Sequence, residues 1–184
     1  MGISIAREAS RRGANVILVI GPVDERIDYP GITVIEVISA EEMARETMKH
    51  FNESDIAVLT AAVADYTPVS SSDSKIKKED RDMVIKLKPT MDIAAELGKK
   101  KKPGQVIAGF ALETDNEKSN AISKLRKKNL DLIVLNSLRE KGAGFRYDTN
   151  RVSIIDKNNN IEDYELKPKA EVAVDILNKI ETMI

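Results

Sequence analysis

The chain of 184 residues contains no cysteine, no tryptophan and a single histidine, His50. The absence of cysteine excludes disulfides, thiolate metal sites and a catalytic thiol. One histidine cannot form a multi-histidine zinc centre, and its position at the end of a predicted helix indicates a capping or surface group rather than a base. Any chemistry must therefore come from carboxylates, lysines, hydroxyls and the backbone.

An excess of charge of one sign is also lacking, because 29 lysines and arginines balance 30 aspartates and glutamates, for a formal net charge of −1. This balance gives no overall attraction to nucleic acid or to an anionic membrane, so neither is expected as a partner. No apolar run approaches the roughly 18–20 residues that cross a bilayer. Residues 1–16 lack the apolar core and the cleavage site of a signal peptide. We therefore expect a cytoplasmic protein.

Apolar residues make up 42% of the chain and alternate between short continuous runs and stripes with a helical period. The pattern predicts helices at 3–13, 40–51, 92–100, 116–129 and from 168 onward, and strands at 16–20, 32–38, 55–64, 83–87, 105–112 and 130–135. Segments 151–156 and 162–166 are predicted to form a β-hairpin, and 69–82 and 142–150 to be loops. The fold class is therefore α/β and Rossmann-like: a mostly parallel sheet with helices on both faces, followed by a C-terminal β-hairpin and helix.

The predicted elements begin with a helix rather than with a strand. A doubly wound nucleotide-binding fold starts with a strand, a glycine-rich turn and a helix whose N-terminus faces phosphate. Here the helix is present, and no strand or glycine-rich loop precedes it. Either the sheet starts with a helix by design, or the first strand and loop are missing. We favour the second reading, in which residues 1–184 are one N-terminally truncated domain of a larger protein.

Several carboxylates are predicted to lie where strands end. Asp65 follows an apolar strand, Asp92 opens a helix, and Glu113 closes the strand that contains Phe110. In open α/β sheets ligands bind beyond the carboxyl ends of the strands, and a carboxylate there can hold Mg²⁺ on phosphate oxygens. For Asp65 and Asp92 the alternative is a turn or N-cap residue.

Lysines form the second group of candidates. The cluster Lys75–Lys78 lies in a serine-rich loop, and Lys124 and Lys128 are four residues apart on one helical face. Such lysines can close over a triphosphate, although most lysine clusters are solvated loops and helix faces. We interpret the run Lys99–Lys102 as solvated lysines at a helix C-terminus, where their charge is favourable to the helix dipole. The residues alone thus predict a Rossmann-like domain that binds an anionic, phosphorylated ligand.

Four segments are more specific in combination: AAVADY at 61–66, KIKK at 75–78, GFALET at 109–114 and KKNLDLIVLN at 127–136. In this order they resemble phosphopantothenoylcysteine synthetase, the ligase domain that most bacteria fuse to a flavin-dependent phosphopantothenoylcysteine decarboxylase. The resemblance implies joining of 4′-phosphopantothenate to L-cysteine in coenzyme A synthesis, with CTP as co-substrate, an acyl-cytidylate intermediate and Mg²⁺ (or Mn²⁺) as cofactor. It also implies a homodimer.

The resemblance further implies roles for eleven residues. Lys75 would be catalytic, reaching the phosphates from a mobile flap near the dimer interface, and Asp65 would contact the nucleotide and its metal. The other expected nucleotide-binding residues are Thr60, Ala61, Thr90, Met91, Asp92, Ile93, Phe110, Lys124 and Lys128. Many relatives have Asn-Pro-Asp-Ile where this chain has residues 90–93. The family's segment Asn-Arg-Ser-Ser-Gly-Lys, whose asparagine acts on the acyl-cytidylate, would precede Met1.

Two alternatives to this ligase remain. A nicotinamide-dependent oxidoreductase is disfavoured because the chain has no GxGxxG motif and no tyrosine–lysine pair spaced for hydride transfer. A truncated, catalytically silent domain that only binds nucleotide or dimerises is the other. Release of pyrophosphate separates the second alternative from the ligase.

Overall fold

The structure, a computed structural model, describes residues 1–25, 27–72, 74–78, 80, 82–113, 115–137 and 147–184. Its helices are α1 (Gly2–Arg11), α2 (Ala40–Phe51), α3 (Ile93–Lys100), α4 (Glu117–Lys127) and α5 (Lys169–Glu181). Its strands are β1 (Val16–Ile20), β2 (Ile32–Glu36), β3 (Ile56–Leu59), β4 (Tyr66–Pro68), β5 (Leu87–Pro89), β6 (Val106–Glu113), β7 (Leu132–Ser137), β8 (Thr149–Asn150), β9 (Val152–Asp156), β10 (Ile161–Asp163) and β11 (Lys167–Pro168).

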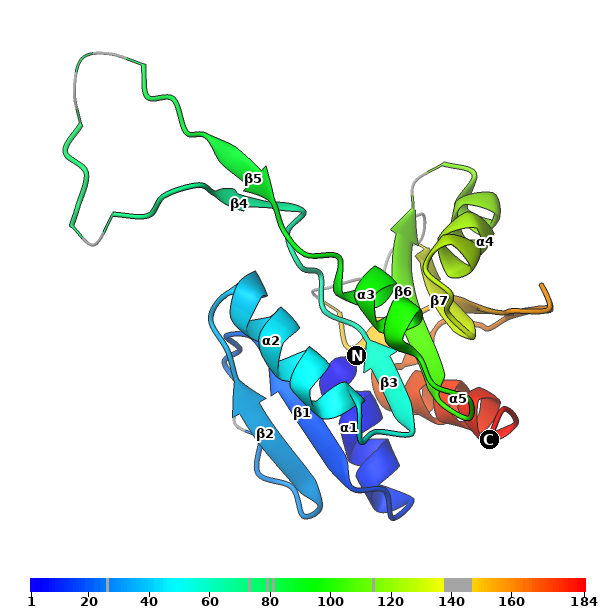
Figure 1. Ribbon diagram of the computed structural model, residues 1–184. Coiled ribbons are helices and arrows are strands. Elements are labelled where there is room, and N and C mark those ends of the chain that lie inside the picture. Colours follow the sequence, from blue (N-terminus) through cyan, green and yellow to red (C-terminus); the bar gives the residue numbers. More distant parts are fainter. Residues whose placement is uncertain (26, 73, 79, 81, 114, 138–146) are drawn as a thin grey trace.

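The central sheet has five strands in the order β10-β9-β7-β6-β3 (Figure 1). Strands β3, β6 and β7 are parallel, and β9 and β10 form the predicted antiparallel hairpin. Strands β1 and β2 pair in parallel as a separate sheet. The mostly parallel α/β fold is thus confirmed, as is the helix after the hairpin. Part of the predicted loop at 142–150 lies outside the described residues, and Thr149–Asn150 pairs with β11 instead.

Two apolar cores cover the two faces of the sheet, because successive residues of each strand point to opposite sides. On β6, Val106 and Ala108 pack against α1 and α5, whereas Ile107 packs against α2, α3 and α4. Ser39 caps α2 through a capping box with Glu42, three residues later. The helices therefore lie on both faces, and the carboxyl ends of β3, β6 and β7 share one edge.

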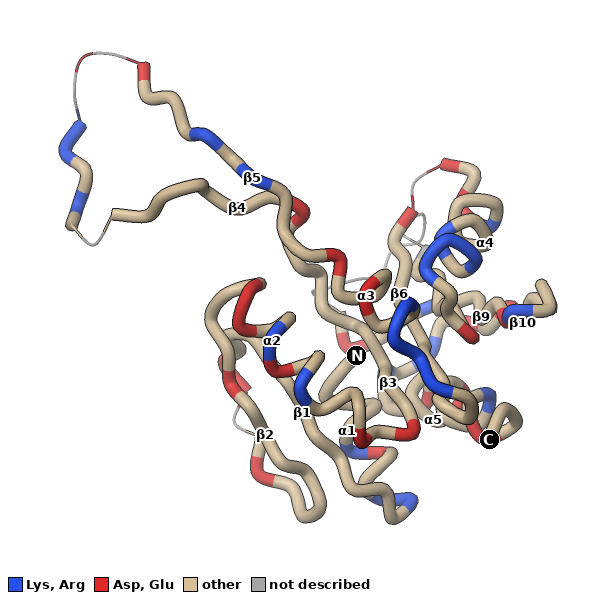
Figure 2. The backbone as a smooth tube through the Cα atoms, viewed as in Figure 1, with Lys and Arg blue, Asp and Glu red and all other residues tan. Residues whose placement is uncertain are grey.

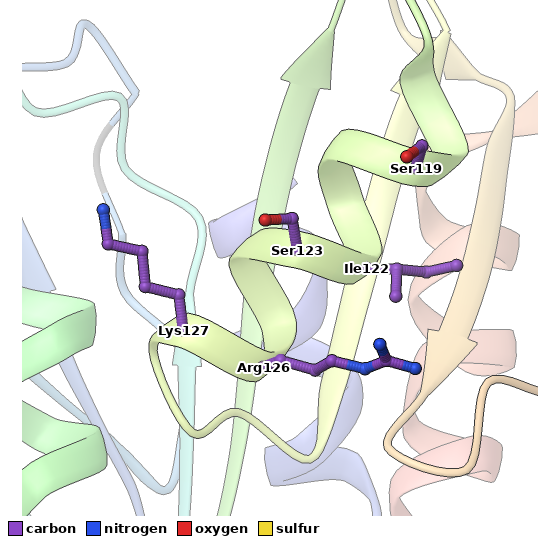
Figure 3. A pocket seen from close by; sticks show the side chains of 5 residues that line it. All are labelled: Ser119, Ile122, Ser123, Arg126 and Lys127. Carbon is purple, nitrogen blue, oxygen red and sulfur yellow. The ribbon is translucent and has the colours of Figure 1, made fainter.

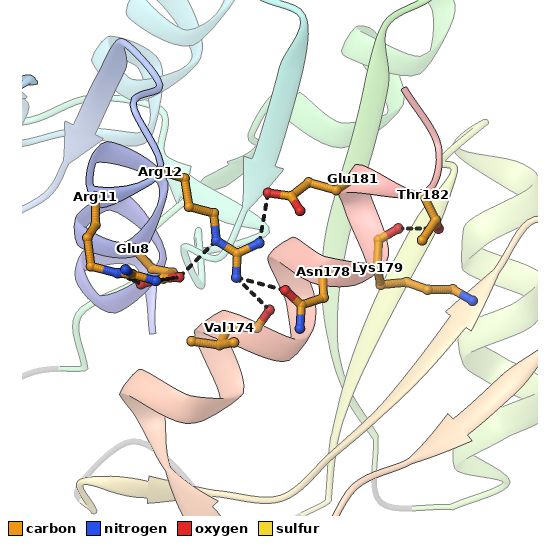
Figure 4. A network of polar contacts seen from close by, with 8 residues as sticks. All are labelled: Glu8, Arg11, Arg12, Val174, Asn178, Lys179, Glu181 and Thr182. Carbon is orange, nitrogen blue, oxygen red and sulfur yellow. Dashed lines mark hydrogen bonds and ion pairs between the residues drawn. The ribbon is translucent and has the colours of Figure 1, made fainter.

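A polar clamp joins the first helix to the last (Figure 4). The guanidinium of Arg12 donates hydrogen bonds to Glu8 and to Glu181, each at 2.8 Å, and to Oδ1 of Asn178 at 2.8 Å. Hydrogen bonds from Arg11 and Arg12 lower the pKa of Glu8 to about 2. The clamp fixes α1 on α5, at the face of the sheet that both helices cover.

A gap separates the two-stranded sheet of β1 and β2 from the five-stranded central sheet. Strand β1 pairs only with β2, and β3 pairs only with β6, so the facing edges of β1 and β3 carry no ladder among the described residues. The prediction of a long buried strand at 55–64 is wrong, because β3 ends at Leu59 and its four residues are only half-buried. Its position as the edge strand beside the gap explains this exposure.

Strands β4 and β5 form the base of an arm, and the chain between them extends away from the body (Figure 1). The strand predicted at 83–87 is wrong in its position, since β5 begins only at Leu87. Val84 is 85% exposed and Ile85 58% exposed, so their apolar alternation faces no core in this chain. Among the described residues, no helix is long and apolar enough to cross a membrane.

Candidate functional site

A cavity of about 1060 Å³ occupies the gap between β1 and β3 and extends past the carboxyl end of β3. Ten of the eleven predicted site residues line it: Thr60, Ala61, Asp65, Thr90, Met91, Asp92, Ile93, Phe110, Lys124 and Lys128. They come from the segment after β3, the base of the arm, the start of α3, β6 and the end of α4. The structure thus brings into one place residues that lie up to 68 positions apart in the sequence.

The segment that follows β3 forms one wall of the cavity, and hydrogen bonds of Thr90 hold it in place. Its backbone N–H donates to the carbonyl oxygen of Asp65 at 2.9 Å, and its hydroxyl donates to the carbonyl oxygen of Ala64 at 2.6 Å. These bonds tie the two roots of the arm together. The side chain of Asp65 is exposed at this wall, and Met91 is 55% exposed beside it, whereas Ile93 is buried. One carboxylate and one thioether are therefore available to a ligand at this wall.

Asp92 and Lys128 face each other across the start of α3 and the end of α4. The carboxylate of Asp92 caps α3 by accepting from the N–H of Ala95 at 3.1 Å, and it lies 3.0 Å from Nζ of Lys128. Burial alone would raise the pKa of Asp92, but the Ala95 N–H and the Lys128 ammonium together lower it. Asp92 therefore stays ionised and holds Lys128 at the cavity.

Two glycines allow close packing behind these residues. An added Cβ at Gly98 would lie 1.9 Å from the carbonyl oxygen of Lys128, and an added Cβ at Gly109 would lie 2.7 Å from Cδ1 of Leu130. Phe110, the next residue of β6, is half-buried and lines the cavity. Nothing in the sequence around Gly98 signals its role, because the close approach is made by a helix 30 residues away.

Lys124, one turn before Lys128, forms an ion pair with Oε1 of Glu113 at 2.5 Å. Both lysines line the cavity, so two ammonium groups stand on one wall. Paired cations of this kind suit a polyphosphate chain, which carries several negative charges along its length.

Lys75 is the one predicted site residue that the structure does not bring to the cavity. It lies on the segment between β4 and β5, where Figure 2 shows lysines and acidic residues along a chain that leaves the body. Its side chain has no ion pair or hydrogen bond among the described residues.

The expectations for two other basic residues need correction. His50 does lie in the last turn of α2, as expected, but the residue is half-buried and lines the cavity, and its Nε2 has no hydrogen-bond partner among the described residues. Lys101 is not solvated, since its Nζ lies 3.0 Å from the buried carboxylate of Asp131 and donates to the carbonyl oxygen of Asn129 at 3.0 Å. For Lys101 the partners come from a segment about 30 positions away in the sequence.

A second hollow, shown in Figure 3, is lined by Ser119, Ile122, Ser123, Arg126 and Lys127. All five residues project from α4, so no second element encloses a ligand there. None of them lines the large cavity, and none is a predicted site residue.

The chain is similar to known proteins along its whole length. The family model described as the DNA/pantothenate metabolism flavoprotein C-terminal domain matches residues 1–183. A protein of an unknown prokaryotic organism, named cysteine/cysteine sulfinic acid decarboxylase, is 58% identical over 184 residues, which are 100% of this chain and 51% of that protein. Coenzyme A biosynthesis bifunctional protein CoaBC of Bacillus subtilis is 43% identical over 185 residues, covering 100% of this chain and 45% of that protein.

A solved structure shares the fold. The crystal structure of the C-terminal domain of coenzyme A biosynthesis bifunctional protein CoaBC superposes with a TM-score of 0.81 at 37% identity, covering 99% of this chain and 81% of that one. The chain spans about half the length of the two curated relatives described above.

Proposed function

Because the chain belongs to the family of DNA/pantothenate metabolism flavoprotein C-terminal domains, we propose that it joins 4′-phosphopantothenate to L-cysteine in coenzyme A biosynthesis, using CTP. The observation that carries the proposal is the gathering of ten predicted site residues around one cavity. The CoaBC relatives support the pathway, and the nucleotide is our inference from the cavity and the resemblance.

The reaction would have two steps. The carboxylate of phosphopantothenate attacks the α-phosphate of CTP, giving an acyl-cytidylate and pyrophosphate, and the cysteine amine then displaces CMP to form the amide. Activation of this kind needs positive charge and positioning more than a tuned histidine or thiol. Lys124 and Lys128 would neutralise phosphate charge, while the backbone at Thr60 and Ala61 and the ring of Phe110 would hold the nucleoside.

The residues present fit Mg²⁺ or Mn²⁺ that is bound mainly by substrate phosphates and by one protein carboxylate. Among the described residues no group of three or more histidine, cysteine, aspartate or glutamate side chains is arranged to hold a metal. Mg²⁺ commonly binds through one or two carboxylates together with substrate phosphates, and Asp65 offers one exposed carboxylate at the cavity. A bound Mg²⁺ would neutralise phosphate charge, and Asp65 would hold it against the nucleotide.

We propose a homodimer in which a second copy covers the arm. Ile76, Val84 and Ile85 are each at least 58% exposed on this extended segment. Apolar side chains on an arm remote from the body have no core to join within one chain, and covering them is favourable. Lys75 lies on the same segment, so it would act only where an arm approaches the phosphates in a cavity. Val84→Glu should shift the chain from dimer to monomer in sedimentation equilibrium, whereas an unchanged mass would refute this interface.

We also propose that the complete protein places one more strand in the gap. Strand β1 runs parallel to β2 and β3 runs parallel to β6, and the cavity between β1 and β3 is lined along both. Gly2, at the start of α1, lies beside Thr60 at the carboxyl end of β3, where such a strand would end. A preceding strand and loop, and a fused decarboxylase domain before them, would account for the partial coverage of the relatives.

A single-turnover assay tests the function directly. The chain extended upstream by its own coding sequence is mixed with CTP, Mg²⁺, labelled phosphopantothenate and cysteine. We expect stoichiometric pyrophosphate and amide from the extended chain. In residues 1–184 alone we expect weaker nucleotide binding, since part of the anion-binding backbone would be absent, and a much slower amide step, since no side chain replaces the asparagine that would act on the acyl-cytidylate. Equal rates of amide formation in the extended chain and in residues 1–184 would contradict the proposal that catalytic groups precede Met1. Absence of pyrophosphate from the extended chain would refute the ligase activity.

The name of the 58% identical relative supplies a second candidate, decarboxylation of cysteine or cysteine sulfinic acid. The same extended chain is therefore assayed for carbon dioxide release from both compounds without CTP. Release from either, with no pyrophosphate in the first assay, would favour that candidate.

A further inference from the structure

The two lysines of the cavity wall are each paired with a carboxylate, but the two pairs differ in exposure. Asp92 lines the cavity and its side chain is 51% exposed, whereas Glu113 is not among the lining residues and its side chain is only 14% exposed. Lys124 itself is 47% exposed and does line the cavity. Glu113 therefore contacts the Lys124 ammonium from the side away from a bound ligand.

The surroundings of Glu113 fix its carboxylate. It is the last residue of β6, and its Oε2 accepts a hydrogen bond from Asn120 at 3.3 Å, in the first turns of α4. Among the described residues its Oε1 accepts no well-directed hydrogen bond, and the Lys124 ammonium is the charged group beside it. A buried charge without a partner is costly, so Lys124 cannot leave Glu113 without a penalty.

An ammonium group has three N–H donors, so one can stay on Glu113 while the others face the cavity. Asp92 differs, because solvent can replace Lys128 at an exposed carboxylate and a phosphate can compete for the lysine. The two pairs thus predict one fixed cation, Lys124, and one exchangeable cation, Lys128.

Resting on the proposed function, we propose that Glu113 is a positioning residue that anchors Lys124 for the phosphates of the nucleotide. Glu113 does not touch the ligand; it acts through Lys124. Removing its charge therefore weakens nucleotide binding, even though it also removes a negative charge near a polyanion. If Glu113 only neutralised the charge of Lys124, removing its negative charge would strengthen nucleotide binding.

A double-mutant cycle tests this assignment by isothermal titration of CTP with Mg²⁺ into the upstream-extended chain. Glu113→Gln should weaken CTP binding about tenfold, because one ammonium contact to phosphate is misplaced. In the Lys124→Ala background the same substitution should cause no further loss. Glu96→Gln is the matched control, since it removes a surface pair with Lys99 and should leave CTP affinity unchanged.

Three results would overturn the assignment: tighter CTP binding by Glu113→Gln, unchanged binding, or an equal loss with and without Lys124. Acetic anhydride labelling gives a readout that needs no nucleotide. Lys124 should label faster in Glu113→Gln than in the parent chain, while Lys118 labels at the same rate in both. Failure of the parent chain to bind CTP would count against the proposed function, and the labelling would then still decide whether Glu113 holds Lys124.

Discussion

Replacing Gly98 by alanine should damage both stability and the candidate site. The added Cβ would lie 1.9 Å from the carbonyl oxygen of Lys128, 2.9 Å from its carbonyl carbon and 3.3 Å from Cβ of Asn129. Normal contacts to a Cβ begin near 3.0 Å, so the end of α4 must move by about 3.0 − 1.9 = 1.1 Å. The groups in contact are backbone, which cannot rotate away as a long side chain would.

Overpacking of this kind costs about 1–3 kcal/mol. The shift would also stretch the hydrogen bond from Nδ2 of Asn129 to the carbonyl oxygen of Gly98, now 2.8 Å. For a chain of this length each kcal/mol lowers Tm by about 2–4 °C, so we expect a loss of roughly 2–12 °C. A displacement of about 1 Å at Lys128 should also weaken CTP binding, because charge pairing with phosphate depends on position.

The assay combines urea unfolding with titration of CTP and Mg²⁺. Gly21→Ala is the control, since its added Cβ would meet only Cε of Met43 at 4.0 Å, an ordinary contact. Stability of Gly98→Ala within about 0.5 kcal/mol of the parent chain would refute the packing argument. A large loss of stability with unchanged CTP affinity would show that Gly98 supports the packing but does not position Lys128 for CTP.

Three further predictions concern Glu8, Lys75 and the choice of nucleotide. Glu8→Gln should lower the free energy of unfolding by about 1–3 kcal/mol at neutral pH, because it weakens hydrogen bonds to two guanidinium groups. Since the pKa of Glu8 is lowered from 4.5 to about 2 in the folded state, its stabilisation is present above pH 4.5 and lost toward pH 2. A gap between the two urea curves that stays constant over this range would contradict the assignment. Lys75→Ala should leave stability within about 0.5 kcal/mol but reduce turnover of the extended chain roughly a hundredfold, with CTP affinity less affected; near-normal turnover would exclude the catalytic role. CTP with Mg²⁺ should raise Tm more than ATP or NADPH does, and an equal or larger shift with ATP would refute the base preference.

Local features of the fold were predictable because they depend on neighbouring residues. The capping box of Ser39 and Glu42, the apolar run at Val16–Ile20 and the stripe of α5 each specify their own element. The arm and β3 were mispredicted for the opposite reason. An apolar alternation such as Met83–Leu87 indicates a strand only if a core lies beside it. Strand β3 is only half-buried because it lies at the edge of the central sheet, beside the gap.

The candidate site divides in the same way. Thr60 and Phe110 converge because β3 and β6 are parallel neighbours, and Asp92 joins them at the start of α3. The close approach at Gly98 depends on the end of α4, which is packed from elsewhere in the chain, and no local pattern marks it.

The clamp between α1 and α5 has a consequence for synthesis of the protein. Arg12 and Glu181 are separated by 169 positions, so the apolar face of α1 cannot dock on its partner helix until nearly the whole chain has left the ribosome. Contacts of such long sequence separation slow folding, because the intervening chain must be ordered first. Until then the first helix and the parallel strands expose apolar surface, which is the kind of surface that chaperones bind during translation.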